Sequence, residues 1–249
     1  MNSSSFAWPN GLKAAISLSY DDALPQHHRT IAPLLKRHGI RGTFYTTING
    51  RFLEESKAWS EVAQTGHELG NHTLFHPCYG EKPGDLPWLD PGYNLRDYSP
   101  KRWEDEVRVA NWALQQVDGR TARSYGNTCG NRFVGQGEAR VCLDDFMLKH
   151  FVAARGSSTG KMIDPNAADL TKLGCVSGDR RMFSELREEL CRVREAESWI
   201  IYCIHGVGPG EHGSFIEAGE HAQLVEWIAA QGDFWAVSVA EAAAWIARK

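Results

Sequence analysis

The chain has 249 residues, a length that one large domain or two small ones can fill. With 42% hydrophobic and 23% charged residues, it can bury a full core as an ordinary globular protein does. Its 27 Lys and Arg residues stand against 31 Asp and Glu residues, which gives a net charge of −4. This balance argues against nucleic acid or an anionic membrane surface as the main partner, because both favour a basic face.

Six cysteines are scattered along the chain without a C-x-x-C pair: Cys78, Cys129, Cys142, Cys175, Cys191 and Cys203. A chain of this length needs no disulfide framework, so we expect reduced, partly buried thiols. The first ten residues show neither a basic start nor an apolar stretch, and no apolar run approaches the roughly 18 residues of a membrane-spanning helix. We therefore expect a soluble, cytoplasmic protein without a signal peptide, and we make no prediction of its oligomeric state.

Short apolar runs alternate along the chain with longer segments of helical periodicity. Strands are expected at 14–20, 42–47, 67–73, 122–125, 151–154, 199–204 and 234–239. Helices are expected at 30–38, 54–65, 101–117, 138–150, 182–197, 220–230 and 240–248. Between them, residues 77–98 hold four prolines and three glycines without any period, and a loop longer than about 12–15 residues is often functional.

The repeated strand–helix alternation implies an α/β fold with parallel strands and helices outside. An open doubly wound sheet and a closed β/α barrel both satisfy it. The first predicted strand is not followed by a glycine-rich nucleotide loop, which weakens the nucleotide-binding open sheet. With no low-complexity linker and no internal repeat, one domain over residues 1–249 is the simplest interpretation.

Polar residues collect where predicted strands end, and barrels place functional residues there. Asp21 and Asp22 follow the first strand, and in an extended backbone they point in opposite directions, so that one can face a metal and the other a different side of the same pocket. The alternative is that an Asp caps the next helix. His205 ends an apolar strand, either as a core residue or as a general acid or base.

His72 and His76 are four positions apart, and their imidazoles can converge on one ion if the segment is tightly turned. Ten histidines would supply roughly 0.4 such pairs by chance, so two loop histidines are the alternative. Together with an Asp at another strand end, the pair offers the N, N, O set of a catalytic divalent site.

Four segments resemble one known family in order along the chain. Ser19–Ala23 is similar to its T-F-D-D-G motif, and His72–Pro77 matches H-[ST]-x-x-H-P at every fixed position. Gly39–Tyr45 is similar to its second strand, and Ile201–His205 to its late L-x-x-x-H motif. The family is that of the polysaccharide deacetylases, carbohydrate esterase family four, and the resemblance runs from about residue 13 to the C-terminus.

The resemblance implies a distorted, incomplete (β/α) barrel with about seven parallel strands. It further implies a divalent metal, in the first place Zn²⁺ and alternatively Co²⁺ or Mn²⁺, bound by Asp22, His72 and His76. Asp21 would be the general base and His205 the general acid. A zinc-bound water, its pKa lowered toward about 7, would be the nucleophile.

The third family motif, R-P-P-[YF]-G, survives only as Arg123–Gly126, without either proline. Arg123 and Arg155 are therefore rivals for holding the base, and Asp179 is a weak candidate for orienting the acid. The backbone N–H of Tyr125 is the predicted oxyanion donor.

Three aromatic residues of the proline-rich loop are candidate substrate-binding residues: Trp88, Tyr93 and Tyr98. They either stack on sugars or are buried to order the loop.

The predicted function is a metal-dependent hydrolase that removes acetyl groups from an N- or O-acetylated carbohydrate, a soluble oligosaccharide or polysaccharide fragment. One alternative is an amidase of the same fold acting on a formyl or cyclic ureide substrate. Another is a non-catalytic carbohydrate-binding barrel. The sequence leaves open which sugar is used, whether the bond is an amide or an ester, and which metal is bound in the cell.

Overall fold

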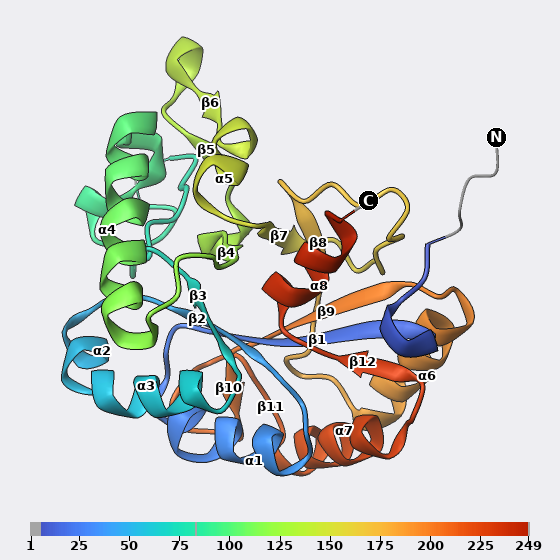
Figure 1. Ribbon diagram of the computed structural model, residues 1–249. Coiled ribbons are helices and arrows are strands. Elements are labelled where there is room, and N and C mark those ends of the chain that lie inside the picture. The colour runs from blue at the N-terminus through green and yellow to red at the C-terminus, as the bar shows by residue number, and fades with distance from the viewer. Residues whose placement is uncertain (1–5, 83, 249) are drawn as a thin grey trace, which may run out of the picture.

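The computed structural model describes residues 6–82 and 84–248 and shows a closed barrel of seven parallel strands (Figure 1). In ring order the strands are β1 (Ala14–Asp21), β2 (Thr43–Thr46), β3 (Glu68–Asn71), β4 (Tyr125–Gly126), β7 (Ala154–Ser158), β8 (Leu173–Ser177) and β9 (Trp199–Ile204). β9 pairs back onto β1 and closes the ring. The prediction of a distorted β/α barrel with about seven parallel strands is confirmed.

Eight α-helices surround the barrel in the described part of the chain, with α1, α3 and α7 side by side along its lower edge in Figure 1. Their bounds are α1 (Ala32–Arg37), α2 (Gly50–Glu54), α3 (Ser56–Gln64), α4 (Pro100–Asp118), α5 (Asp144–His150), α6 (Phe183–Glu195), α7 (Ala218–Ala230) and α8 (Val239–Ile246). The remaining strands are β5 (Phe133–Val134), β6 (Val141–Cys142), β10 (Gly206–Val207), β11 (Phe215–Ile216) and β12 (Phe234–Ala236).

The two faces of β1 show why the ring can be this narrow. Ile16, Leu18 and Tyr20 belong to the large apolar cluster that includes the surrounding helices. The alternate residues face the interior and are small: Ser17 accepts a hydrogen bond from the indole of Trp199, and Ser19 donates one to the Tyr202 carbonyl. A seven-stranded barrel has little internal room, so small inward residues let the ring close without a void.

Helix α8 covers the amino end of the barrel. The backbone N–H of Val239 donates to Oγ1 of Thr43, and that of Ala240 donates to Oε2 of Glu68. Thr43 and Glu68 are the first residues of β2 and β3. The apolar side of α8 packs against inward residues of the barrel, among them Trp199. With the amino end filled, the carboxyl ends of the strands are left for a site.

The number of barrel strands agrees with the prediction, but one of the predicted segments is not a strand of the barrel. Residues 234–239 were expected among the main strands, yet β12 pairs only with the first three residues of β1, beside the ring. The missing place is filled by β8, whose short run Leu173–Ser177 has a glycine inside it and gives a weak strand pattern. The predicted helix 138–150 begins only at Asp144, because a short turn and strand β6 occupy the preceding residues.

The expectation of six reduced thiols is wrong for two of them. Cys78 and Cys129 form a disulfide, while the other four cysteines are free. The two are 51 positions apart in sequence, but each lies in the loop after one of the neighbouring strands β3 and β4, so the barrel brings them together. No helix in the described ranges is long and apolar enough to cross a membrane.

Candidate active site

A cavity of about 730 Å³ opens at the carboxyl ends of the barrel strands. Six of the seven predicted site residues that line it lie in or soon after barrel strands: Asp21, Asp22, His72, His76, Arg155 and His205. They come from the end of β1, the turn after β3, strand β7 and the end of β9. Its volume is in the range of small-molecule sites.

The turn after β3 is built by side chains that accept backbone hydrogen bonds. Oδ1 of Asn71 accepts the N–H of Thr73 at 2.8 Å, and Oγ1 of Thr73 accepts the N–H of His76 at 3.0 Å. Glu106 of α4 accepts two further N–H groups of the same turn. Thr73 and His76 adopt positive φ angles of 66° and 52°. This tight turn brings the rings of His72 and His76 to a centroid separation of 4.9 Å.

Asp22, His72 and His76 meet as a possible metal-binding group. Oδ1 of Asp22 lies 3.5 Å from Nε2 of His72 and 3.2 Å from Nε2 of His76. Ligands of a tetrahedral zinc ion lie roughly 3.4 Å apart when each is about 2.0–2.2 Å from the metal, so these separations fit such an ion. Nδ1 of His72 donates to the Gly126 carbonyl at 2.7 Å, which leaves the lone pair of Nε2 available. The residues present therefore fit a divalent metal.

The electrostatics of the group favour an ionised carboxylate. Burial raises the pKa of Asp22, but the adjacent imidazoles of His72 and His76 outweigh burial and hold that pKa well below its ordinary value. Burial lowers the pKa of His76, and Asp22 overcomes this and raises it. The anionic ligand oxygen is thus present over the whole neutral pH range.

Asp21 is held apart from that group by an arginine. Nη2 of Arg155 donates to Oδ2 of Asp21 at 2.5 Å, and both side chains are buried. Burial raises the pKa of Asp21, but the charge of Arg155, followed by that of His72, outweighs it and lowers the pKa. Arg123, the rival from the third motif, is buried against Asp118 and the Leu69 carbonyl instead. Arg155 is therefore the residue that holds Asp21.

His205 is fixed by Asp179. Oδ2 of Asp179 accepts the Nδ1–H of His205 at 2.6 Å, and Oδ1 accepts its backbone N–H at 3.0 Å. His27 donates from Nε2 to the His205 carbonyl at 2.8 Å. Burial lowers the pKa of His205, but the hydrogen bond with Asp179 and the charge of Asp21 raise it to about 9. The ring is therefore an imidazolium at neutral pH, with Nε2 left to donate.

Comparison with known proteins identifies the family of this chain. A family model described as polysaccharide deacetylase matches residues 9–132, about half of the chain and including Asp21, Asp22, His72 and His76. The chain belongs to the polysaccharide deacetylase family.

Two curated relatives match parts of this family member. It is 27% identical over 110 residues to a chitooligosaccharide deacetylase of Azorhizobium caulinodans, which covers 43% of this chain and 44% of that protein. It is 23% identical over 150 residues to a gellan lyase of a Bacillus species, which covers 60% of this chain and 5% of that protein. The chain thus spans less than half the length of these relatives.

Solved structures share the fold of this polysaccharide deacetylase family member over nearly its whole length. A probable polysaccharide deacetylase from Pseudomonas aeruginosa has a TM-score of 0.64 at 10% identity, covering 97% of this chain and 93% of the other. A putative polysaccharide deacetylase from Mycobacterium smegmatis has a TM-score of 0.61 at 14% identity, covering 98% and 93%. At these identities the likeness shows the fold.

The other predicted residues lie in different places relative to the cavity. Trp88 is exposed and lines the cavity, but Tyr98 is buried in the core beside α4 and Tyr93 stacks on Phe75 outside the cavity wall. The side chain of Tyr125 is buried as well, and its backbone N–H donates to the Ala153 carbonyl at 2.9 Å. Tyr125 is therefore not the predicted oxyanion donor, because pairing between β4 and β7 already engages that N–H.

His212 is a site residue that the sequence interpretation missed. Its ring stacks on that of His205 at a centroid distance of 4.7 Å and an interplanar angle of 10°. Nε2 lies 3.7 Å from Oδ2 of Asp22, and Nδ1 accepts the N–H of Ser214 at 3.0 Å. A lone histidine seven positions after His205 gave little reason to expect this, apart from the glycine-rich loop in which it lies.

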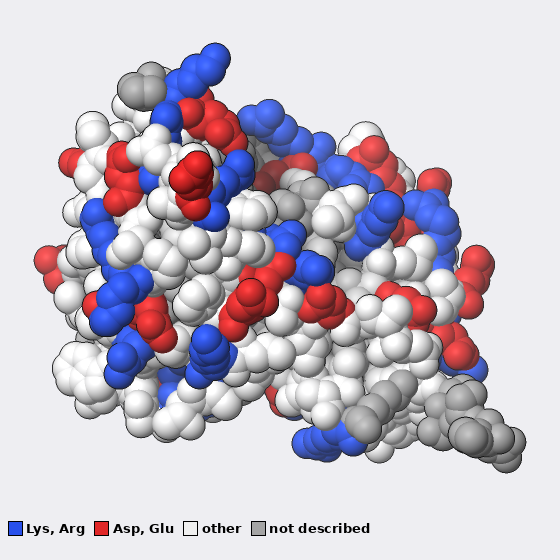
Figure 2. Space-filling model, turned by 90° about the horizontal axis from the view of Figure 1, so that it is seen from above, with Lys and Arg blue, Asp and Glu red and all other residues white. Residues whose placement is uncertain are grey.

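The charged surface of the protein is mixed. On the face that Figure 2 shows, Lys and Arg side chains alternate with Asp and Glu instead of gathering into an area of one sign. This agrees with the net charge of −4.

Proposed function

We propose that the protein is a metal-dependent deacetylase that hydrolyses acetyl groups from an N- or O-acetylated carbohydrate, a soluble oligosaccharide or a polysaccharide fragment. The observation that carries the proposal is the joint placement of three groups in one cavity. These are the N, N, O set of Asp22, His72 and His76, the arginine-held carboxylate of Asp21, and the carboxylate-held imidazole of His205.

A divalent ion bound to Asp22, His72 and His76 supplies Lewis acidity that makes water nucleophilic at neutral pH. Asp21 then acts as the general base. Its Oδ2 is 3.9 Å from Nε2 of His72, so it borders the ligand group without belonging to it. Arg155 fixes its orientation and keeps it ionised, so that it can take the proton of the attacking water.

His205 acts as the general acid that protonates the leaving group. Because Asp179 engages Nδ1, the proton on Nε2 is the one that can be donated to the departing amine or alkoxide. The raised pKa keeps that proton in place while Asp21, with its lowered pKa, stays unprotonated. One carboxylate and one imidazolium thus divide the roles of base and acid at the same pH.

The rim of the cavity gives a sugar a place to bind. Trp88 lines the cavity, with 61% of its surface exposed, and its ring lies 6.3 Å from that of His76. Aromatic faces of this kind stack on apolar faces of sugar rings. The curated chitooligosaccharide deacetylase relative supports a choice of acetylated amino sugars as the first substrates to test.

The test combines metal analysis with a substrate panel. We expect about one divalent ion per chain in the purified wild type and in His38→Ala, which changes a histidine remote from the cavity, and much less in His76→Ala. Acetate release is then followed on N-acetylated and O-acetylated oligosaccharides, with formamides and cyclic ureides as competing substrates. Equal metal content in all three proteins would refute the metal site. A metal-loaded enzyme that turns over only formamides or ureides would refute the acetyl specificity.

A further inference from the structure

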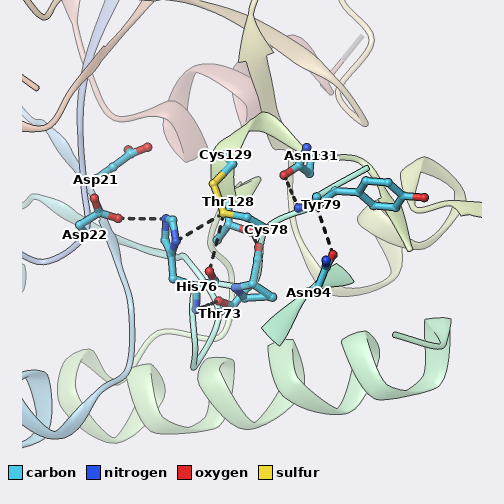
Figure 3. Close-up of a disulfide and its surroundings, with 12 residues drawn as sticks. Asp21, Asp22, Thr73, His76, Cys78, Tyr79, Asn94, Thr128, Cys129 and Asn131 are labelled. Atoms are coloured by element: carbon cyan, nitrogen blue, oxygen red, sulfur yellow. Dashed lines mark hydrogen bonds and ion pairs between the residues drawn. A yellow bond between two sulfur atoms is a disulfide. The ribbon is translucent and has the colours of Figure 1, made fainter. Parts of the chain in front are cut away.

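The Cys78–Cys129 disulfide lies directly against one of the metal-ligand candidates. Sγ of Cys78 is 3.7 Å from Nδ1 of His76, and Figure 3 shows the bridge and Asp22 on opposite sides of that imidazole. Cys78 is fully buried, whereas Cys129 is exposed and lines the cavity. The bridge therefore belongs to the wall of the active site.

The two histidines of the metal group are supported in different ways. His72 directly follows β3 and its Nδ1 donates to the Gly126 carbonyl at 2.7 Å. His76 lies four residues further on, outside any helix or strand, in the left-handed region of φ. On its Nδ1 side it contacts the sulfur of Cys78. The placement of His76 thus depends on how its loop is anchored.

The loop is anchored on both sides of Cys78 to the loop after β4. The hydroxyl of Thr128 donates to the Pro77 carbonyl, and Oδ1 of Asn131 accepts the N–H of Tyr79 at 2.9 Å. These hydrogen bonds fix the residues next to Cys78, and the disulfide is the covalent bond between the same two loops (Figure 3). The carbonyl of Gly126, which orients His72, belongs to the last residue of β4, directly before the second loop, so the bridge links the supports of both histidines.

We propose that the Cys78–Cys129 disulfide is a positioning element for the metal site, which holds His76 at the distance from Asp22 that metal binding requires. The proposal rests on the metal site of the proposed function. When the bridge is opened, the loop keeps its hydrogen bonds but loses its covalent anchor, and the affinity for the metal falls. Such outer supports typically contribute 10- to 100-fold in metal affinity. The form that binds metal tightly is then the form found in an oxidising compartment.

The test measures metal affinity directly. The Kd for Zn²⁺ is determined by competition with a chromophoric chelator for the oxidised wild type, for the double variant Cys78→Ser/Cys129→Ser, and for Cys191→Ser, a free cysteine of α6. We expect the Kd to rise about 10- to 100-fold in the double variant and to stay unchanged in Cys191→Ser. An unchanged Kd in the double variant would overturn the proposal.

A second comparison separates positioning from stability. Leu190→Ala removes a fully buried side chain of α6, remote from the cavity, and lowers the thermal midpoint without touching the loops. We expect its Kd for Zn²⁺ to equal that of the wild type. If Leu190→Ala and the double variant weaken binding equally, the bridge is merely structural and the proposal fails.

Reduction of the wild type provides the same test should the double variant not fold. A phosphine and one water molecule supply two electrons and two protons, so the S–S bond becomes two thiols and the phosphine becomes its oxide. After removal of the reagent without air, the folded, reduced protein is expected to show the weakened Kd. Binding as tight as in the oxidised form would contradict the proposal. Failure of the oxidised wild type to bind Zn²⁺ at all would instead refute the proposed function itself.

Discussion

Replacement of Asp179 by asparagine tests the acid half of the site. The carboxylate of Asp179 accepts both the Nδ1–H and the backbone N–H of His205. Burial lowers the pKa of His205, and the hydrogen bond with Asp179 is the largest contribution that raises it, from 6.5 to about 9. At about 1.4 kcal/mol for each unit of pKa, this difference corresponds to roughly 3 kcal/mol in favour of the imidazolium. The substitution Asp179→Asn keeps the size of the side chain but removes its charge, so we expect the pKa of His205 to fall toward 6.5 or below.

The sign of the effect on catalysis follows from the proposed role of His205 as the general acid. The protonated ring is the active form, so the alkaline limb of kcat against pH moves to lower pH in Asp179→Asn. We expect a loss of about 10²-fold at about pH 8.5 and less than about 2-fold near pH 5.5. Acetate release over this range gives the profile, and metal content serves as the control. An alkaline limb that stays in place would refute the pairing of Asp179 with the acid.

The same pairing has a signature in stability. Because the pKa of His205 is raised on folding, its contribution to the free energy of unfolding is fully present below about pH 6.5 and is lost as the pH rises through about 9. Urea unfolding of the metal-free proteins gives the free energy of unfolding of wild type and of Asp179→Asn at each pH. The difference between the two should be largest below about pH 6.5 and should shrink as the pH rises toward about 9. A difference that does not change between these pH values would contradict the pKa assignment.

Three further variants probe the base, the barrel wall and the rim. Asp21→Asn should keep the metal and lower kcat about 10²- to 10⁴-fold, whereas an Asp that only caps a helix would leave kcat unchanged. Gly70→Ala would place a Cβ 2.5 Å from the buried Tyr45 ring and should cost about 1–3 kcal/mol in urea unfolding; an unchanged midpoint would contradict this packing. Trp88→Ala should raise KM with kcat unchanged, and an unaltered KM would place the ring outside the substrate path.

The residues of the proposed metal site could be picked out from the sequence because each of them lies in a segment with a recognisable local pattern. His72 and His76 lie in one short turn, and Asp22 follows a strand whose apolar run is unmistakable. The shape of this turn is determined by residues within it, since Asn71 and Thr73 accept the hydrogen bonds that form the turn.

The second half of the site could not be predicted in the same way. Arg155 is 134 positions from Asp21, and Asp179 is 26 positions from His205. Strand β8, which ends two residues before Asp179, carries only a weak pattern. The choice between Arg123 and Arg155 depends on which of them the closed ring places beside Asp21.

The sequence by itself determined the alternation of strands and helices, the histidine motif of the proposed metal site and the position of most polar residues at strand ends, because periodicity and short motifs are local properties. The pairing of strands around the ring, including the closure of β9 onto β1, decided the rest. It brought Arg155 to Asp21, buried Tyr98 while leaving Trp88 at the rim, engaged the N–H of Tyr125, and set the loops of Cys78 and Cys129 side by side. These outcomes depend on contacts between residues far apart in the chain, and only the packed barrel specifies them.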